Sequence, residues 1–556
     1  MRKRQNILHF LWFLGLSAGL LVLSQFFFFR LDFTADKRYS ISPATKATLK
    51  QLEDVVMVKV YLDGELPSGF RRFRSSIEET LEEFQAYGHA NIQYEFIDPD
   101  LISDKKEKDE FLIGMAQRGI QPTNIHVKEE GQKIEKLIFP GAIVSYKGKE
   151  VPVMLLKGNS ATDPNEILNQ SAENVEYELV SAIKKLTRGA KKRIAILSGH
   201  GEPDNIRFAD LAAALKESYE VKRLDVSKAE QILTYDAILL DQPTVPFSEA
   251  DLLKIDQFLM RGGTGIFLID PIRIKLDSMG ANGSFIFPYD LNLDDLLFKY
   301  GVRINKDLLQ DIYCAQIPMT VGNLGDKPQI QLVPWTYFPV LNNYAKHPIT
   351  KSLDALQAKF ISSLDTVKAE GIRKTPLLST SEYTKLSPVL GNVDLNQMRN
   401  DPNPALYKGG VKTIAYLLEG SFKSPFASRP IAKPTGYLGV GKPTSIIVMS
   451  DGDVALNDVN PKNGQPMPLG YDPYMRRNYS NKDFIVNGFH YLLDEDGLIT
   501  TKNKEISLRP LDKGKIRDGK TRYQLMNVLL PPMLVLLAWW GLALRRRKKF
   551  QRSFNN

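Results

Sequence analysis

Two uncharged apolar runs near the ends of the chain constrain its fold more than any other feature of the sequence. The first run, residues 7–29, has 23 residues, which at about 1.5 Å per residue exceed a hydrocarbon core of about 30 Å. The second run, residues 526–544, contains Pro531 and Pro532, which predict a kink or a fresh helical turn. We therefore predict one transmembrane helix at each end, with residues 30–525 on one side of the membrane.

The distribution of charge supports this topology. Of 73 Lys and Arg residues, nine lie in the two tails, residues 1–29 and 545–556, which contain no acidic residue. The remaining 64 balance the 64 Asp and Glu residues, so the body is neutral and offers no electrostatic case for nucleic-acid binding. Basic residues beside apolar runs favour the cytoplasm. A cleaved signal peptide is the alternative for the first run, but no A-x-A-like site follows Phe29.

The first part of the body has the pattern of a small α/β layer. Residues 31–188 predict the order β-α-β-α-β-β, closed by a long helix over about 165–185. Ser42 before Pro43 predicts a helix start, and Lys147 with Gly148 predicts a hairpin turn. The order resembles a thioredoxin-like unit, but the absence of a C-x-x-C motif excludes a redox function.

The next part predicts a parallel sheet with a candidate site at its edge. Residues 193–270 alternate short apolar segments with helical ones, which is typical of βαβ units. Such sheets bind ligands at the carboxyl ends of their strands. The candidate ligand-binding residues there are Ser198, Gly199, His200, Gly201, Glu202, Asp241 and Asp270. The alternative is a tight turn in which Glu202 to Asp204 cap the following helix.

Other motifs favour neither a metal site nor catalysis. Asp451 and Asp453 are weak candidates for metal ligands, because they lack the remaining ligands of an EF-hand loop. Residues 436–443 imitate a P-loop, but they carry Pro443 at the Mg²⁺-binding position and precede a strand, so we reject an ATP site. We find no G-x-S-x-G or H-E-x-x-H motif, and we predict no catalytic residue and no cofactor.

Several segments in a fixed order resemble one family. They are RYSISPATKATLKQL, IAILSGHGEPD, HPITKSLDALQAKF, SIIVMSDGD and the second apolar run. Together they resemble the ABC-transporter auxiliary family, and within it the gliding-motility-associated, substrate-binding-type components of Bacteroidetes-type bacteria. The resemblance implies an amidotransferase-like (flavodoxin-like) middle unit without catalytic residues, which agrees with Asp270 and Pro271 at the position of the nucleophile. It also implies a permease-like membrane subunit and a cytoplasmic ABC ATPase as partners.

We divide the chain into seven parts on these grounds. They are a tail and anchor (1–30), a thioredoxin-like domain (31–188), an amidotransferase-like domain (189–345), its mixed α/β extension (346–510), a basic linker (511–525), a transmembrane helix (526–544) and a basic tail (545–556). We expect a non-enzymatic auxiliary subunit of an ABC complex in the bacterial inner membrane, with a periplasmic body, cytoplasmic termini and a role in gliding motility. The alternatives are a tethered hydrolase or transferase of envelope glycan or peptide, and a true solute receptor.

Overall fold

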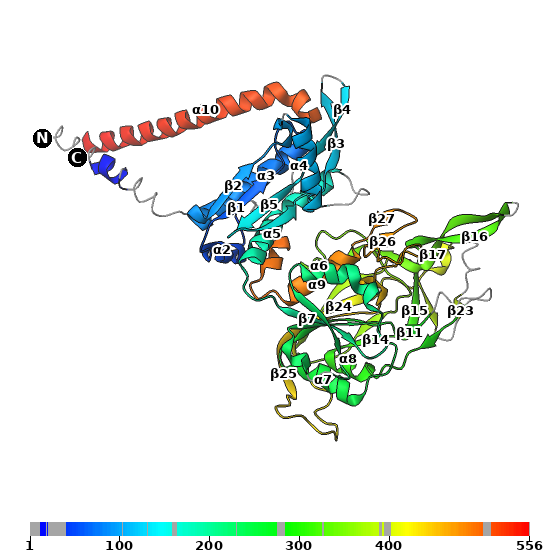
Figure 1. Ribbon diagram of the computed structural model, residues 1–556. Helices are drawn as coiled ribbons and strands as arrows, with labels where there is room; N and C mark the ends of the chain where they lie inside the picture. The colour runs from blue at the N-terminus through cyan, green and yellow to red at the C-terminus, as the bar shows by residue number, and fades with distance from the viewer. Residues whose placement is uncertain are drawn as a thin grey trace. The chain divides into compact units, whose positions relative to one another are not determined.

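The protein consists of two compact units, Met1–Ile506 and Ser507–Asn556. The computed structural model (Figure 1) describes residues 12–17, 19, 40–102, 104–129, 132–157, 164–228, 231–274, 284–324, 327–388, 392–393, 402–503 and 513–554. The first unit combines helices with several β-sheets, and the second contains one long helix. The mixed α/β class predicted from the sequence is therefore confirmed.

A four-stranded mixed sheet lies in the N-terminal part of the first unit. Its strands are, in spatial order, β2 (Ile92–Phe96), β1 (Val56–Val60), β5 (Gly141–Tyr146) and β6 (Lys149–Met154). β1 is parallel to β2 and antiparallel to β5, and β5 is antiparallel to β6. Helices α3 (Ser68–Gly88) and α5 (Pro164–Thr187) pack against each other and against this sheet.

Local sequence signals explain most elements of this part. Helix α2 (Pro43–Lys50) begins after Ser42, whose hydroxyl accepts a hydrogen bond from the Thr45 N–H at 3.0 Å. The β5–β6 turn has positive φ at Lys147 and Gly148, as a two-residue hairpin requires. Helix α4 (Lys105–Gln117) begins after Asp104, whose carboxylate accepts a hydrogen bond from the Glu107 N–H at 2.8 Å. The hairpin of β3 (Thr123–Glu129) and β4 (Gln132–Ile138) was not predicted.

An eight-stranded sheet organises the rest of the first unit. Its strands are, in spatial order, β18 (Asn343–Tyr344), β21 (Ile372–Ser379), β24 (Thr413–Lys423), β25 (Val440–Met449), β10 (Thr264–Leu268), β9 (Ala237–Asp241), β7 (Arg193–Ser198) and β8 (Glu220–Asp225). The strands from β25 to β8 are parallel, which confirms the predicted parallel sheet. The strands from β18 to β25 pair antiparallel.

Helices cover both faces of the parallel half. Helices α6 (Ala209–Lys216) and α9 (Asn481–Leu492) lie on one side, and α7 (Glu249–Met260) and α8 (Asp294–Tyr300) lie on the other (Figure 1). Successive residues of β7 belong to different cores, since Ile194 packs with Leu211 while Ala195 packs with Leu252. A strand buried on both faces must be apolar throughout, which explains the short continuous apolar segments of the sequence.

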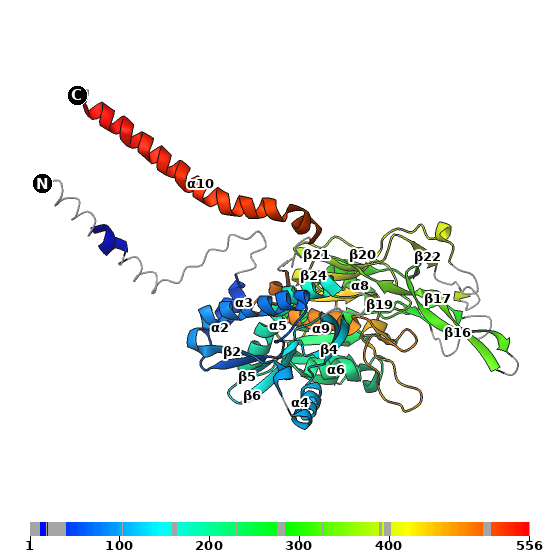
Figure 2. The same ribbon diagram turned by 90° about the horizontal axis from the view of Figure 1, so that it is seen from above.

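The remaining strands form small sheets. A long hairpin of β16 (Cys314–Leu324) and β17 (Lys327–Leu341) projects from its surroundings (Figure 2), and β19 (Leu356–Gln357) pairs with β17. The other pairs are β11 (Ile272–Arg273) with β13 (Phe287–Pro288), β12 (Ser284–Phe285) with β23 (Asn392–Val393), β14 (Val302–Ile304) with β20 (Leu364–Thr366), β15 (Asp307–Asp311) with β22 (Thr384–Pro388), and β26 (Tyr471–Asp472) with β27 (Arg477–Asn478).

The second unit holds helix α10 (Lys513–Phe554), which continues through Pro531 and Pro532. Its segment Gly519–Arg545 is long and apolar enough to cross a membrane, and no other described helix is. The apolar side chains of this segment are exposed, as lipid-facing side chains would be. Of the first predicted span, only residues 12–17 and 19 are described, and they are helical and mostly exposed; the rest lies outside the described residues.

Candidate functional site

The predicted site residues lie at one edge of the eight-stranded sheet. Strands β7, β9, β10 and β25 are parallel neighbours, so their carboxyl ends meet at this edge. The glycine-rich loop follows β7, Asp241 ends β9, Asp270 follows β10, and Asp451 follows β25. The fold thus brings together two segments, 198–202 and 450–453, that are far apart in the sequence.

The loop after β7 is fixed by a hydrogen bond within the loop and by hydrogen bonds from the loop after β9. The His200 N–H donates to Glu202 Oε2 at 2.7 Å, and the His200 carbonyl accepts from the Thr244 N–H at 2.8 Å. Gly201 has a φ of +78°, and a Cβ at this position would overlap the Thr244 hydroxyl. Glycine is therefore required here by the backbone conformation and by the close approach of Thr244.

The His200 side chain is enclosed, with an exposed fraction of 4%. Its ring stacks on Phe247 with centroids 3.8 Å apart, and its Nε2 lies 3.4 Å from Asp251 Oδ2. Burial raises the pKa of Asp251, but hydrogen bonds from Ser248 and Lys254 outweigh this effect and lower it. His200 is thus packed between an aromatic ring and a carboxylate that stays ionised.

Four aspartates and Glu202 form what we call the acidic edge: Asp241, Asp270, Asp451, Asp453 and Glu202. Asp270 accepts hydrogen bonds from the Gln242 amide at 2.6 Å and from the Gly452 N–H at 2.8 Å. Asp451 accepts from the Lys359 N–H and from the Asp453 N–H, both at 2.9 Å. Through these hydrogen bonds, Asp270 connects the loop after β10 to the loop after β25, and Asp451 connects the loop after β25 to Lys359.

Burial raises the pKa values of the four aspartates of the acidic edge. Burial, and then repulsion from Asp453, raise the pKa of Asp270 to about 7. Burial also raises the pKa of Asp241 and of Asp451 well above their ordinary values, with further contributions from the neighbouring carboxylates. The pKa of Asp453 is raised by burial in spite of nearby Lys359 and Arg207. Removing like charges from water is costly, so protonation relieves the repulsion.

Some buried polar atoms at this edge have no hydrogen-bond partner. They are Asp241 Oδ1 and Oδ2, Glu202 Oε1 and His200 Nδ1. Among the described residues, no group of three or more His, Cys, Asp or Glu side chains is arranged to hold a metal ion. The edge can therefore accept hydrogen bonds from a polar ligand, or donate them from protonated carboxyl groups, but it has no arranged set of metal ligands.

Sequence reasoning missed three contributors to this edge. Gln242 has a φ of +49° and donates to Asp270, while Phe247 and Asp251 enclose His200. Gln242 directly follows a buried strand, and this position is the signal that could have identified it. Phe247 and Asp251 carry no such signal, because their contact with His200 depends on how the β9–α7 connection folds back.

Comparisons with known proteins identify relatives without a described activity. Residues 191–488, more than half of the chain, match a family described as an ABC-type uncharacterized transport system, and residues 35–145 match a domain of unknown function. A Borreliella burgdorferi protein, named only as uncharacterized, is 24% identical over 537 residues, which cover 94% of each chain.

Two solved structures share remote similarity with this chain. One is the mmIFT52 N-terminal domain, with 14% identity, a TM-score of 0.32, and coverage of 55% of this chain and 99% of that one. The other is a putative ThuA-like protein from Parabacteroides merdae, with 10% identity, a TM-score of 0.28, and coverage of 55% and 91%. These similarities are too remote to carry an argument about function.

Proposed function

The chain belongs to the family of ABC-type uncharacterized transport systems, and from this premise we propose that it is a membrane-anchored auxiliary subunit of an ABC transporter complex. The subunit itself is non-catalytic, and its partners are a permease-like membrane subunit and a separate cytoplasmic ATPase. The family match over residues 191–488 carries the proposal. The P-loop-like residues 436–443 add support, because they run into the extended strand β25 and do not open a helix.

The proposed topology has two spans, residues 7–29 and 526–544, in the bacterial inner membrane. Both basic tails lie in the cytoplasm, and the body lies in the periplasm. Support comes from the candidate membrane helix within α10 and from the apolar composition of the first run.

The proposed body contains a thioredoxin-like domain (31–188) and an amidotransferase-like domain (189–345) that residues 346–510 extend. Strands β24 and β25 support this last assignment, because they complete the sheet that β7 to β10 begin. The narrower role in gliding motility rests on the sequence resemblance.

Co-purification tests the proposed partnership. The tagged full chain is purified in mild detergent from its native membranes, and associated proteins are identified by mass spectrometry. We expect a multispan membrane protein and an ABC ATPase in stable ratio with the bait. A bait that purifies without both of them would contradict the proposal. A chain truncated before residue 513, purified in the same way, shows whether the association needs α10.

Cysteine labelling tests the topology. Burial raises the pKa of the only cysteine, Cys314, to about 12, so the native thiol reacts slowly with maleimide near neutral pH. In intact spheroplasts, an impermeant maleimide is expected to label a Lys462→Cys variant and to leave a Ser553→Cys variant unlabelled until the membrane is broken. Equal labelling of both variants would exclude the proposed orientation.

Solute binding at the acidic edge is a second candidate function. It is favoured by buried atoms of Asp241, Glu202 and His200 that form no hydrogen bond, although His200 Nδ1 and Glu202 Oε1 lie 4.0 Å apart. A ligand rich in N–H or O–H groups could form hydrogen bonds with these atoms. The candidate binding residues are Ser198, Gly199, His200, Gly201, Glu202 and Asp270. Addition of cell-envelope sugars or peptides is expected to raise the unfolding midpoint of the full chain, and less so in a Glu202→Gln variant. The absence of any such rise would remove this candidate.

A further inference from the structure

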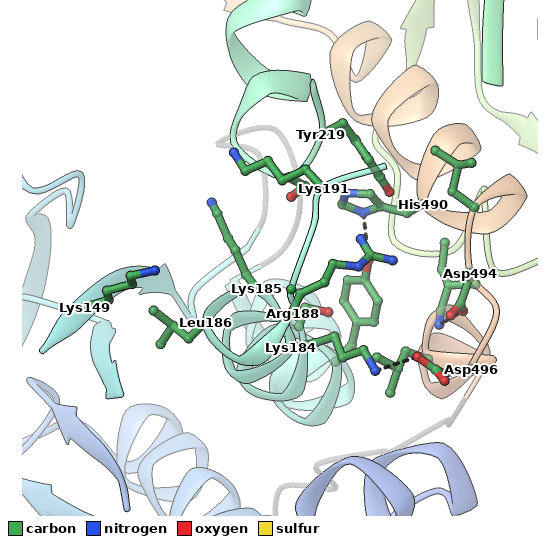
Figure 3. Close-up of a pocket in the computed structure, with 17 residues that line it drawn as sticks. Lys149, Lys184, Lys185, Leu186, Arg188, Lys191, Tyr219, His490, Asp494 and Asp496 are labelled. Atoms are coloured by element: carbon green, nitrogen blue, oxygen red, sulfur yellow. Dashed lines mark hydrogen bonds and ion pairs between the residues drawn. The ribbon is translucent and has the colours of Figure 1, made fainter. Parts of the chain in front are cut away.

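A cavity of about 230 Å³ opens beside the C-terminal end of α5, and Figure 3 shows the side chains that line it. Five cationic side chains contribute to its wall: Lys149, Lys184, Lys185, Arg188 and Lys191. We call this cavity the basic pocket. Its two acidic side chains are Asp494 and Asp496, so its lining carries an excess of positive charge.

Both carboxylates of the basic pocket already have partners. Asp496 forms an ion pair with Lys184 at 2.7 Å, and Asp494 Oδ2 accepts a hydrogen bond from the Ile499 N–H at 2.7 Å. Asp494 therefore stabilises the turn that contains Ile499, and Asp496 forms an ion pair with one lysine, Lys184. Asp494 keeps its negative charge, so the two carboxylates together offset two of the five cations in the lining.

The other four cationic side chains of the pocket differ in their hydrogen-bond and ion-pair partners. Lys191 donates to the carbonyls of Lys216 and Glu217, and Lys185 pairs with the exposed Glu217 at 3.0 Å. Arg188 and Lys149 form no ion pair with any described carboxylate. In Figure 3 the guanidinium group of Arg188 extends toward His490 in the pocket. Arginine does not discharge in proteins, so the half-buried Arg188 keeps its positive charge in the pocket, beside the Tyr219 hydroxyl.

Neutral hydrogen-bonding groups line the inner part of the pocket. Burial, and then the charge of Lys502, lower the pKa of His490 to about 3, so its ring is neutral, and its Nδ1 lies 2.9 Å from the Tyr177 hydroxyl. Burial raises the pKa of Tyr219 while Arg188 opposes it, so this hydroxyl keeps its proton. The pocket therefore offers neutral hydrogen-bonding groups, His490 and the Tyr219 hydroxyl, beside its excess positive charge.

A further buried cation lies behind the Tyr177 ring. Lys502 Nζ is 4.3 Å from the ring centroid and donates to Asn487 Oδ1 at 2.8 Å. Its only close hydrogen-bonding acceptor in the described structure is thus a neutral amide. Burial lowers the pKa of Lys502 to about 8, although the charges of Glu178 and Asp483 oppose this shift.

From this charge imbalance we propose that the basic pocket binds the phosphate group of a phosphate ester, with Arg188 and Lys149 as its main cationic contacts. A phosphate group carries about −1.5 to −2 at neutral pH and accepts bidentate hydrogen bonds from a guanidinium group, which suits an excess of about three positive charges. The volume is below the roughly 300–1,000 Å³ of typical drug-sized sites, so it suits a phosphate with a small organic group. A soluble phosphate monoester and the headgroup of phosphatidic acid, which is also a monoester, share this chemistry.

The test uses the full chain in detergent micelles and two probes, inorganic pyrophosphate and dispersed dihexanoyl phosphatidic acid. Binding is measured by titration calorimetry and by the unfolding midpoint at low ionic strength. The pocket variant Arg188→Gln/Lys149→Gln is compared with Arg476→Gln/Lys462→Gln, which removes the same charges from exposed surface. We expect at least one probe to bind the wild type and the control alike, and the pocket variant at least ten-fold more weakly.

The outcomes separate the two sources and can overturn the proposal. Tighter binding of pyrophosphate assigns the site to a soluble ester, and tighter binding of the lipid assigns it to a headgroup. No binding of either probe, or equal loss in both variants, overturns the proposal. If the pocket variant still co-purifies with the transporter partners, its loss of phosphate binding is independent of the proposed association with a transporter.

Discussion

The acidic edge and the basic pocket are two polar regions of one compact unit that deal with excess charge in different ways. At the acidic edge, the carboxylates are buried, and they accept backbone hydrogen bonds or retain protons. In the basic pocket, Arg188 cannot give up its charge, and the structure leaves a cavity beside it. The comparison teaches that a buried acidic cluster can lose its charge by binding protons, whereas a cluster that contains arginine keeps its positive charge at neutral pH.

The largest expected change in the free energy of unfolding comes from adding a methyl group at a glycine of each region, which compares how tightly the two regions are packed. Gly201→Ala places a Cβ at a φ of +78° and against the Thr244 hydroxyl, so we expect a loss of about 3 kcal/mol in the free energy of unfolding. Gly189 lines the basic pocket, and a Cβ there meets nothing within 4 Å. Gly189→Ala is therefore expected to change stability by less than about 0.5 kcal/mol. Thermal unfolding of both variants measures the difference, and equal losses would contradict it.

A smaller effect should come from the buried lysine behind the pocket. Burial lowers the pKa of Lys502 to about 8. Between that value and the ordinary value of 10.5, the unfolded chain binds a proton that the folded chain has released, so stability rises with pH across this window. The Lys502→Met variant is expected to lack this rise, which we place at about 1–2 kcal/mol. A rise of equal size in the variant, measured by unfolding between pH 7.5 and 10, would refute the assignment.

The pH dependence of the acidic edge should have the opposite sign. Burial raises the pKa of Asp241, so its contribution to stability is complete below the ordinary carboxyl pKa and is lost as the pH rises through the raised value. The asparagine side chain of the Asp241→Asn variant does not ionise, so the variant does not lose this contribution to stability as the pH rises. We expect its unfolding midpoint to match the wild type near pH 4 and to exceed it by about 1–2 °C at pH 8. A midpoint below the wild type at pH 8 would show that Asp241 is ionised and paired.

The smallest expected effect comes from Asp225, at the end of the neighbouring strand β8. Hydrogen bonds from Ser227 and Lys228 lower its pKa to about 2, so its contribution is present above the ordinary carboxyl pKa and is lost as the pH falls through about 2. Asp225→Asn should therefore lower the midpoint at neutral pH, by under 1 °C because the group is exposed to solvent. The opposite signs at Asp241 and Asp225 would show that burial decides the response.

The sequence alone predicted the parallel strands and the starts of helices α2 and α5, because these follow from local signals. The apolar segment of β7 and the Ser42 cap of α2 are examples. It also placed candidates at the strand ends, where parallel-sheet ligands bind. It did not predict that Asp451 lies near Asp241, because that proximity requires β25, from a distant part of the chain, to pair with β10. Pairing between distant strands has no local signature.

The sequence by itself therefore determined the apolar runs, the neutral body, the α/β class and the residue types at the strand ends, since composition and short periodic patterns encode these features. The tertiary structure alone decided which charges share a region. The basic pocket combines α5 with residues near Tyr219 and His490, and none of these segments is adjacent in the chain. Electrostatic energy depends on distance and burial in space, and only the folded chain sets both.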